Sequence, residues 1–194
     1  HMKLLVDAGL ATREQRGRIR IPWLARRAER SIITSAPRVI VVSRPLVDEV
    51  RELGVDASHI ARMPMAVNLD KFHPSIGGGP VRQRYGLADR FVIGYVGTLA
   101  GWHGIRLLYD LAQELRGRGV ERFAFLVVGG EGDKLEMNLR KAREAGLSDH
   151  LRFIGSVTHD DVPMHVRAFD AAIVPDTTYW SSPAKLFEYQ ASGV

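Results

Sequence analysis

A lysine and a glutamate three residues apart form the most informative pair of side chains in the sequence. Lys185 and Glu188 share one face of a predicted helix that follows the apolar run 169–175. Ser182 is a good N-cap residue for this helix, and Pro183 suits the first helical position. The unpaired backbone N–H groups of a helix start bind anions, and Lys185 adds a positive charge there. The pattern suits phosphates at the helix start and a sugar hydroxyl near Glu188, as in a nucleotide-sugar, although an ordinary surface Lys–Glu pair is an equal alternative.

A glycine-rich turn follows the predicted strand 91–97 and reads Gly97-Thr-Leu-Ala-Gly-Trp-His-Gly104. Glycines let backbone amides approach a phosphate closely, and His103 could donate to a phosphate oxygen. The turn is neither a GxGxxG fingerprint nor a P-loop. The alternative is that Trp102 and His103 only pack and cap the following helix.

Two further turns carry weaker signals. Gly129-Gly-Glu-Gly-Asp133 permits close approach to a ligand, but it also fits a plain strand-to-helix turn. Phe153-Ile-Gly-Ser-Val157 could present backbone groups to the edge of a base. The histidines show no metal-ligand spacing with acidic neighbours, and no Ser/His/Asp series stands out. We therefore expect no metal site.

The composition is that of an ordinary globular protein, with 194 residues, 45% of them hydrophobic, and a net charge of +5. No cysteine is present, which is compatible with a cytoplasmic protein. No apolar run approaches the roughly 18 residues of a membrane span. Arginines crowd residues 13–30, which predicts either a contact with an anionic membrane surface or a solvated helix. No nucleic-acid-binding fingerprint accompanies the charge.

The elements that position these residues alternate regularly in the second part of the chain. Apolar runs at 91–97, 123–129, 151–155 and 171–175 predict buried strands, each followed by a helical pattern. This order predicts an α/β fold, a Rossmann-like parallel sheet with helices on both faces. Ligands of such sheets bind outside the carboxyl ends of the strands, where all the turns above fall.

Residues 1–74 predict a separate, partial domain. A short strand at 38–42, a helix after Ser43 and a possible strand at 60–63 indicate the tail end of a second Rossmann-like domain and its connection. The glycine-rich stretch Ser75–Pro80 predicts the interdomain linker. The expected domains are therefore 1–74 and 75–194, the latter incomplete at its C-terminal end.

Taken together, these segments resemble the family-4 group of retaining glycosyltransferases, which have the GT-B fold of two facing Rossmann-like domains. The resemblance covers about residues 38–194. It is carried, in chain order, by Arg38-Val-Ile-Val-Val-Ser43, Pro64-Met-Ala-Val-Asn-Leu-Asp-Lys-Phe-His-Pro74, Val96-Gly-Thr-Leu-Ala-Gly-Trp-His-Gly104, Val128-Gly-Gly-Glu-Gly132, Phe153-Ile-Gly155 and Ser182-Pro-Ala-Lys-Leu-Phe-Glu-Tyr-Gln-Ala191.

The resemblance implies transfer of a sugar from a UDP-sugar or GDP-sugar to an unknown hydroxyl acceptor, with retention and with no metal or other cofactor. It implies that Lys185 contacts the donor phosphates and is catalytic, because it would stabilise charge on the leaving nucleoside diphosphate. It implies that Glu188 binds the ribose and that the backbone at 153–157 faces the base. The full set of expected nucleotide-sugar-binding residues is Gly97, Thr98, His103, Gly104, Val157, Ser182, Pro183, Lys185 and Glu188.

Several departures from the family pattern matter. Trp180 stands where the family's first paired glutamate would contact the transferred sugar, and Thr98 and His103 replace an arginine and a lysine of many relatives. The chain resembles about half of a full enzyme, so we expect little transferase activity from it alone and self-association through an uncovered sheet edge. A non-catalytic nucleotide-binding module and a GT-B UDP-sugar epimerase remain as alternatives.

Overall fold

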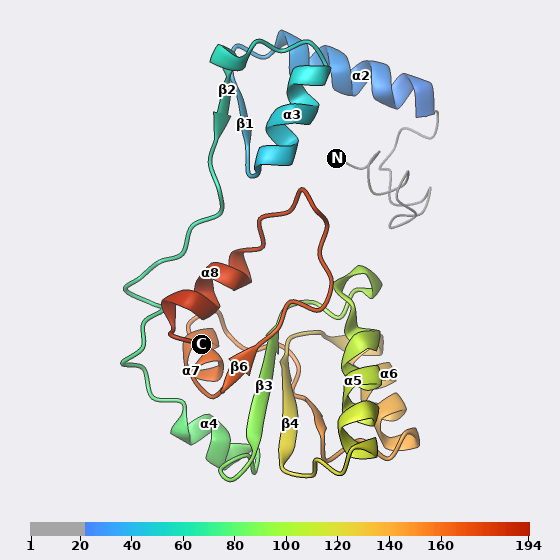
Figure 1. Cartoon of the computed structure of the whole chain (residues 1–194), viewed down its shortest axis with the longest axis vertical. Helices are drawn as coiled ribbons and strands as arrows, with labels where there is room; N and C mark the ends of the chain where they lie inside the picture. The colour runs from blue at the N-terminus through green and yellow to red at the C-terminus, as the bar shows by residue number, and fades with distance from the viewer. Residues whose placement is uncertain (1–21) are drawn as a thin grey trace. The chain divides into compact units, whose positions relative to one another are not determined.

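The computed structural model describes residues 22–194, which fall into two compact units. The first unit runs to Pro64 and also takes in the later segment Thr178–Ser182. The second unit comprises Met65–Thr177 and Pro183–Val194 (Figure 1). Most of the arginine-rich segment predicted at 13–30 lies outside the described residues.

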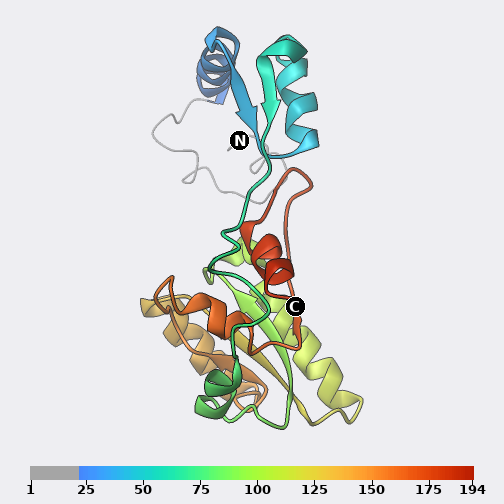
Figure 2. The same ribbon diagram turned by 90° about the vertical axis from the view of Figure 1, so that its left-hand side faces the viewer.

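The first unit is built on two short parallel strands, with Val39 paired to Ile60 (Figure 2). Its core holds the buried side chains of Val41, Leu46 and Val50, since the helix after β1 turns its apolar positions toward the strands. Ser43 is the N-cap of that helix as predicted, although its hydroxyl makes no capping bond. The elements are α2 (Pro22–Ser35), β1 (Val39–Val41), α3 (Arg44–Glu52), η2 (Ala57–His59) and β2 (Ile60–Arg62).

The second unit contains a four-stranded sheet in which every pairing is parallel. The strands are β3 (Phe91–Val96), β4 (Phe123–Val128), β5 (Leu151–Phe153) and β6 (Ala171–Ala172). The helices are α4 (Gly79–Arg84), η3 (Gly101–His103), α5 (Ile105–Gly117), α6 (Gly132–Glu144), α7 (Val162–Val166) and α8 (Ala184–Ala191). The predicted α/β class with a parallel sheet is therefore confirmed.

Alternate residues of the central strand β4 face opposite layers, as the two-residue period of a strand requires. Phe125 and Val127 pack in one cluster with residues of α5 and α6. Leu126 and Val128 pack in another with residues of α4, α7 and α8. Figure 1 shows α5 and α6 on one side of the sheet and α7 and α8 on the other. Every residue of β4 is buried, so helices cover both faces as expected.

The strand order β5-β4-β3-β6 places the first and fourth strands of the second unit next to each other. The chain builds outward from β3 through β4 to β5, then returns to the other side of β3 as β6. This reversal is a topological switch point, where the loops after two adjacent strands leave in opposite directions and open a crevice. The loops that follow β3 and β6 therefore form the expected ligand site.

The change of unit lies at Pro64–Met65, which differs from the sequence-based boundary at 74/75. Phe72 is 2% exposed and packs in the core of the second unit, so the extended connection before it already belongs there. Ser75–Pro80, predicted as the linker, also lies in this unit, where the Arg167 guanidinium donates to the Ile76 carbonyl at 3.1 Å. The glycine at 78 serves close packing, because a Cβ there would lie 2.2 Å from the Arg167 carbonyl oxygen.

Two element boundaries in the site region differ from the predicted ones. The ladder of β6 ends at Ala172 instead of Pro175, although Ile173 still donates its N–H to Gly94 at 2.9 Å. Helix α8 begins at Ala184, so Pro183 is its N-cap and Ser182 precedes the cap. Pro183 has ψ 119°, an extended value, which keeps it out of the helix. The prediction of Ser182 as N-cap and Pro183 as first helical residue was therefore wrong by one position.

Candidate functional site at the carboxyl ends of β3 and β6

Gly97 ends β3 at a point where the backbone must lie open. Its φ is +151°, and its N–H donates to the Val128 carbonyl at 2.9 Å. A Cβ built on Gly97 would lie 2.8 Å from Lys185 Nζ and 2.8 Å from the Tyr95 hydroxyl oxygen. Only glycine leaves room for the ammonium group to approach the end of this strand. The structure thus brings together Gly97 and Lys185, between which the sequence places α5, β4, α6, β5, α7 and β6.

Lys185 is held over an aromatic ring inside the unit. Its Nζ lies 4.4 Å from the centroid of the Tyr95 ring and donates to the Tyr95 hydroxyl at 3.4 Å. That hydroxyl in turn donates to the Thr98 carbonyl at 2.9 Å, so one chain of contacts joins Lys185 to the turn after β3. Burial lowers the pKa of Lys185, and the carboxylate of Glu188 partly offsets this effect. A half-buried ammonium group of this kind is positioned to meet an anion.

Glu188 lies one turn further along α8. Burial raises its pKa, while the nearby charges of His159 and Lys185 act in the opposite direction. The helix is fixed at this point, since the Val96 N–H donates to the hydroxyl of the adjacent Tyr189 at 2.8 Å. The last residue of β3 therefore sets the distance between the strand end and the Lys185–Glu188 face.

The turn after β3 closes with His103 and Gly104. Gly104 has φ +67° and is the N-cap of α5. A Cβ on Gly104 would lie 2.7 Å from the Cβ of Asp176, so this turn packs directly on the residue that follows Pro175. Burial and the charge of Lys185 lower the pKa of His103, whereas Asp176 raises it. His103 thus lies within electrostatic reach of both.

Sequence reasoning missed Asp176 and His159. The signal for Asp176 was its place as the first polar residue after the apolar run 169–175. His159 lies in the segment between β5 and α7, and its charge acts on Glu188. Both stand near a strand's carboxyl end, which is the position that decides ligand contacts in such sheets.

The remaining predicted site residues have a different status. Thr98 is exposed, and its carbonyl oxygen accepts a hydrogen bond from the Tyr95 hydroxyl. Val157 packs against the core cluster that includes Tyr189, the neighbour of Glu188. Ser182 belongs to the first unit, and Pro183 begins the return to the second.

The start of α8 supplies further positive potential. Pro183 makes no side-chain capping bond, so the first backbone N–H groups lack a side-chain acceptor from the cap residue. Lys185 stands in this first turn. The ammonium group and the helix dipole together favour an anionic ligand at the carboxyl edge of the sheet.

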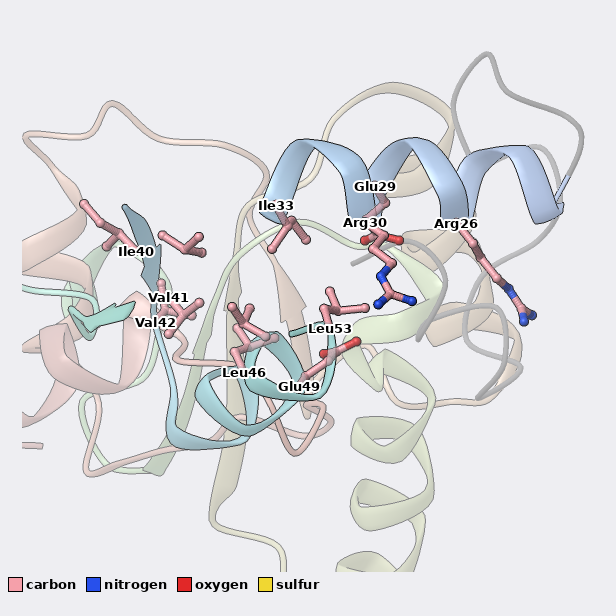
Figure 3. Close-up of a pocket in the computed structure, with 12 residues that line it drawn as sticks. Arg26, Glu29, Arg30, Ile33, Ile40, Val41, Val42, Leu46, Glu49 and Leu53 are labelled. Atoms are coloured by element: carbon pink, nitrogen blue, oxygen red, sulfur yellow. The ribbon is translucent and has the colours of Figure 1, made fainter. Parts of the chain in front are cut away.

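Two cavities lie away from Lys185. One of about 330 Å³ occupies the first unit, where α2 and α3 side chains face each other across an apolar floor (Figure 3). Charged side chains of Arg26, Glu29, Arg30 and Glu49 rim it. The other, of about 350 Å³, is lined by residues of η3, α5 and α6, including Tyr109 and Lys134. Neither includes a residue of the Lys185–Glu188 pair.

Within residues 22–194, no group of three or more His, Cys, Asp or Glu side chains is arranged to hold a metal ion. In the same part of the chain, no helix is long and apolar enough to cross a membrane.

Comparisons with known proteins point to one kind of chemistry. The family model described as glycosyl transferases group 1 matches residues 90–194. A GDP-mannose-dependent alpha-(1-6)-phosphatidylinositol monomannoside mannosyltransferase of Mycolicibacterium smegmatis is 31% identical over 156 residues, which cover 80% of this chain and 40% of that protein. A 2-deoxystreptamine glucosyltransferase of Streptomyces kanamyceticus is 32% identical over 156 residues, 79% of this chain and 38% of that protein.

Solved structures share the fold. The Anabaena protein HepE in complex with UDP-glucose superimposes with a TM-score of 0.72 at 22% identity, covering 88% of this chain and 47% of that one. The sucrose-phosphate synthase of Thermosynechococcus elongatus gives a TM-score of 0.67 at 22% identity, with 91% and 43% covered. The chain thus spans about 40% of the length of the curated relatives and less than half of these structures.

Proposed function

The chain belongs to the glycosyl transferases group 1 family, and we propose that its second unit binds a nucleoside diphosphate sugar for transfer to a hydroxyl acceptor. The observation that carries the proposal is the approach of the Lys185 ammonium group to the glycine that ends β3. A diphosphate in the crevice would meet this charge, the start of α8 and the open backbone at Gly97 together. The curated relatives named above, a mannosyltransferase and a glucosyltransferase, support the reaction class.

The residues take separate roles in this proposal. Lys185 binds the phosphates and stabilises the negative charge that builds on the nucleoside diphosphate as the bond to the sugar breaks. His103, Thr98 and Gly104 border the phosphates from the turn after β3. Glu188 accepts hydrogen bonds from the ribose hydroxyls, because a carboxylate one turn along α8 faces the same crevice.

The base end and the reaction course are further parts of the proposal. Val157 and its backbone, past the end of β5, border the base, while Ser182 and Pro183 border the phosphates at the entry to α8. We propose transfer with retention and without a metal cofactor, since the ammonium group and the helix start already provide positive charge for the leaving group. The donor is a UDP-sugar or a GDP-sugar; relatives named for GDP-mannose and a structure holding UDP-glucose support both.

We also propose a cytoplasmic location at a membrane surface. The exposed Trp23, Arg26, Arg27 and Arg30 of α2 support a surface contact, and a relative named for a phosphatidylinositol mannoside supports a lipid acceptor. Self-association is a second proposal for the first unit, whose exposed Ile40 and Met63 lie in or beside its two strands.

Thermal unfolding with nucleotides tests the donor proposal. We expect one of UDP, GDP, UDP-glucose or GDP-mannose to raise the unfolding midpoint, because a ligand at about 100 times its dissociation constant adds roughly 2.7 kcal/mol. For a chain of this size, that is a shift of roughly 5–11 °C. Lys185→Met and Glu188→Gln should abolish or reduce the shift. Lys141→Met, which removes an exposed lysine of α6, should leave it unchanged.

The Lys185→Met variant also separates binding from folding. Since burial lowers the pKa of Lys185, its charged form costs folding free energy at neutral pH, and the variant should melt no lower than the parent chain. A full shift retained in Lys185→Met, or no shift with any of the four nucleotides, would refute the proposed site.

A further inference from the structure

Asp176 is a carboxylate beside the proposed phosphate site that none of the proposed roles uses. It follows β6 at the switch point, and it packs against Gly104 in the turn after β3, where a Cβ would lie 3.0 Å from the Asp176 backbone nitrogen. Its side chain is exposed. Among the described residues, its carboxylate has no hydrogen-bond or ion-pair partner. The position therefore places an acceptor group beside the turn after β3, on the side of β6.

The charges around the crevice make this carboxylate unusual. Lys185 and His103 favour an anion there, and the negative charge of Asp176 opposes one. Its influence reaches His103, whose pKa it raises against the effects of burial and of Lys185. A diphosphate cannot lie against Asp176 without repulsion, so Asp176 must face a part of the ligand that carries hydrogen-bond donors and no negative charge.

A nucleoside diphosphate sugar has such parts on both sides of the diphosphate, the nucleoside with its base and ribose on one side and the transferred sugar on the other. Glu188, beyond Lys185 on α8, is already placed for the ribose. Asp176 lies at the other boundary of the phosphate site, against the Gly104 turn. We propose that Asp176 binds hydroxyl groups of the transferred sugar and thereby contributes to the choice of that sugar. This inference rests on the proposed function of the same crevice.

The chemistry of the contact explains why a carboxylate suits this position. A carboxylate accepts hydrogen bonds from two hydroxyls, and charge-assisted bonds of this kind are stronger than neutral ones. A site that offers such a group discriminates strongly against an analogue without the hydroxyls, since the carboxylate then faces the diphosphate unpaired. Trp180 supplies no such group, because an indole has no acceptor oxygen, and its side chain packs against the core cluster of the first unit.

The test compares nucleotides with and without the sugar on the same 194-residue chain. Dissociation constants for UDP, UDP-glucose, GDP and GDP-mannose are measured by calorimetry, first with the parent chain and then with Asp176→Ala and Asp176→Asn. We expect Asp176→Ala to weaken binding of the nucleotide-sugar by about tenfold. The matching nucleoside diphosphate should bind as well as before or more tightly, because a negative charge has gone. Asp176→Asn, which keeps a neutral acceptor, should fall between.

Weaker binding of the nucleotide-sugar together with unchanged or tighter binding of the diphosphate is the signature that a purely structural role would not produce. Equal weakening of the diphosphate and its sugar, or no change for either, overturns the proposal. Glu136→Ala, which removes an exposed carboxylate from α6 beyond the turn after β4, is the control and should alter neither constant. If the parent chain binds none of the four probes, the proposed function itself fails before any variant is compared.

Discussion

The two units of this chain differ in how completely their strands are buried and in the size of their hydrophobic cores. In the second, β4 is buried along its whole length between two clusters. In the first, two short parallel strands share one small cluster, and Ile40 of β1 is 60% exposed. Parallel sheets are normally covered on both faces, and two strands alone are marginal in water. The second unit therefore carries both the stability and the candidate site.

Core truncations should make this difference measurable. Leu126 is fully buried at the centre of β4, and Leu126→Ala should cost about 3–5 kcal/mol of unfolding free energy. Leu46 in α3 is 5% exposed in the smaller cluster, so Leu46→Ala should cost nearer 2 kcal/mol. Urea unfolding by circular dichroism, with and without nucleotide, measures both. Only Leu126→Ala should reduce the nucleotide-stabilised transition.

Leu111→Ala is the control for this pair, because that side chain is 39% exposed on α5 and its loss should change stability by less than about 0.5 kcal/mol. Should Leu46→Ala weaken the nucleotide-stabilised transition as much as Leu126→Ala does, the two units unfold as one and the contrast is wrong.

The second prediction concerns Thr178–Ser182, a segment from near the C-terminal end of the sequence that belongs to the first unit. Trp180, in Thr178–Ser182, packs against the cluster of Val41, Leu46 and Val50. Trp180→Ala should destabilise the first unit by about 1–3 kcal/mol, less than a fully buried tryptophan because Trp180 is only half-buried. Hydrogen exchange of the Met63 amide, which donates to the Val41 carbonyl at 2.8 Å, reports this unit.

The neighbouring aromatic provides the matched control. Tyr179 is 73% exposed, so Tyr179→Ala should leave exchange in β1 and β2 unchanged. Unaltered exchange in Trp180→Ala would show that the first unit holds together without this segment.

Sequence reasoning succeeded where local patterns decide the outcome. Continuous apolar runs located β3, β4 and β5, and their alternation with helices predicted the parallel sheet. The rule that ligands bind outside the carboxyl ends of parallel strands then placed Gly97, His103 and Lys185 at one edge of the sheet, where the structure has them. These features depend on periodicity and connection order, both of which a sequence contains.

The features that sequence reasoning missed depend on contacts between residues far apart in the sequence. Trp180 packs against the core cluster of the first unit, and Asp176 packs against Gly104. No local sequence pattern predicts either contact. The start of α8 was misplaced by one position because Ser182 and Pro183 fit the preferences for an N-cap and a first helical residue, whereas the extended ψ of Pro183 makes Pro183 itself the N-cap. Phe72 likewise joined the second core although its stretch resembled a connection.

The last prediction uses the opposite responses of the two units to pH. Burial and Lys185 lower the pKa of His103, so the ring is neutral in the free protein at pH 7. A bound diphosphate would bring negative charge beside it and raise that pKa, so binding should take up a proton. Affinity should then fall as pH rises from the lowered pKa of the free protein to the raised pKa of the complex, by at most about tenfold per pH unit.

The first unit provides the contrast in sign. In η2, the Ser58 hydroxyl and N–H donate to the Asp56 carboxylate and lower its pKa. Its contribution to stability is present above the unfolded pKa and is lost as pH falls through the folded pKa. Acid should therefore weaken the first unit, whereas a fall in pH towards the lowered pKa of His103 should strengthen ligand binding by the second.

Calorimetry with UDP-glucose or GDP-mannose between pH 5 and pH 8 measures the effect, because the diphosphate of a nucleotide-sugar has no ionisation of its own in this range. Heats in two buffers of different ionisation enthalpy give the number of protons taken up. His103→Gln keeps a hydrogen-bond donor but cannot titrate, so its affinity should not change with pH. An equal pH dependence in His103→Gln would assign the proton to another group, and the charge of His103 would then have no part in binding the diphosphate.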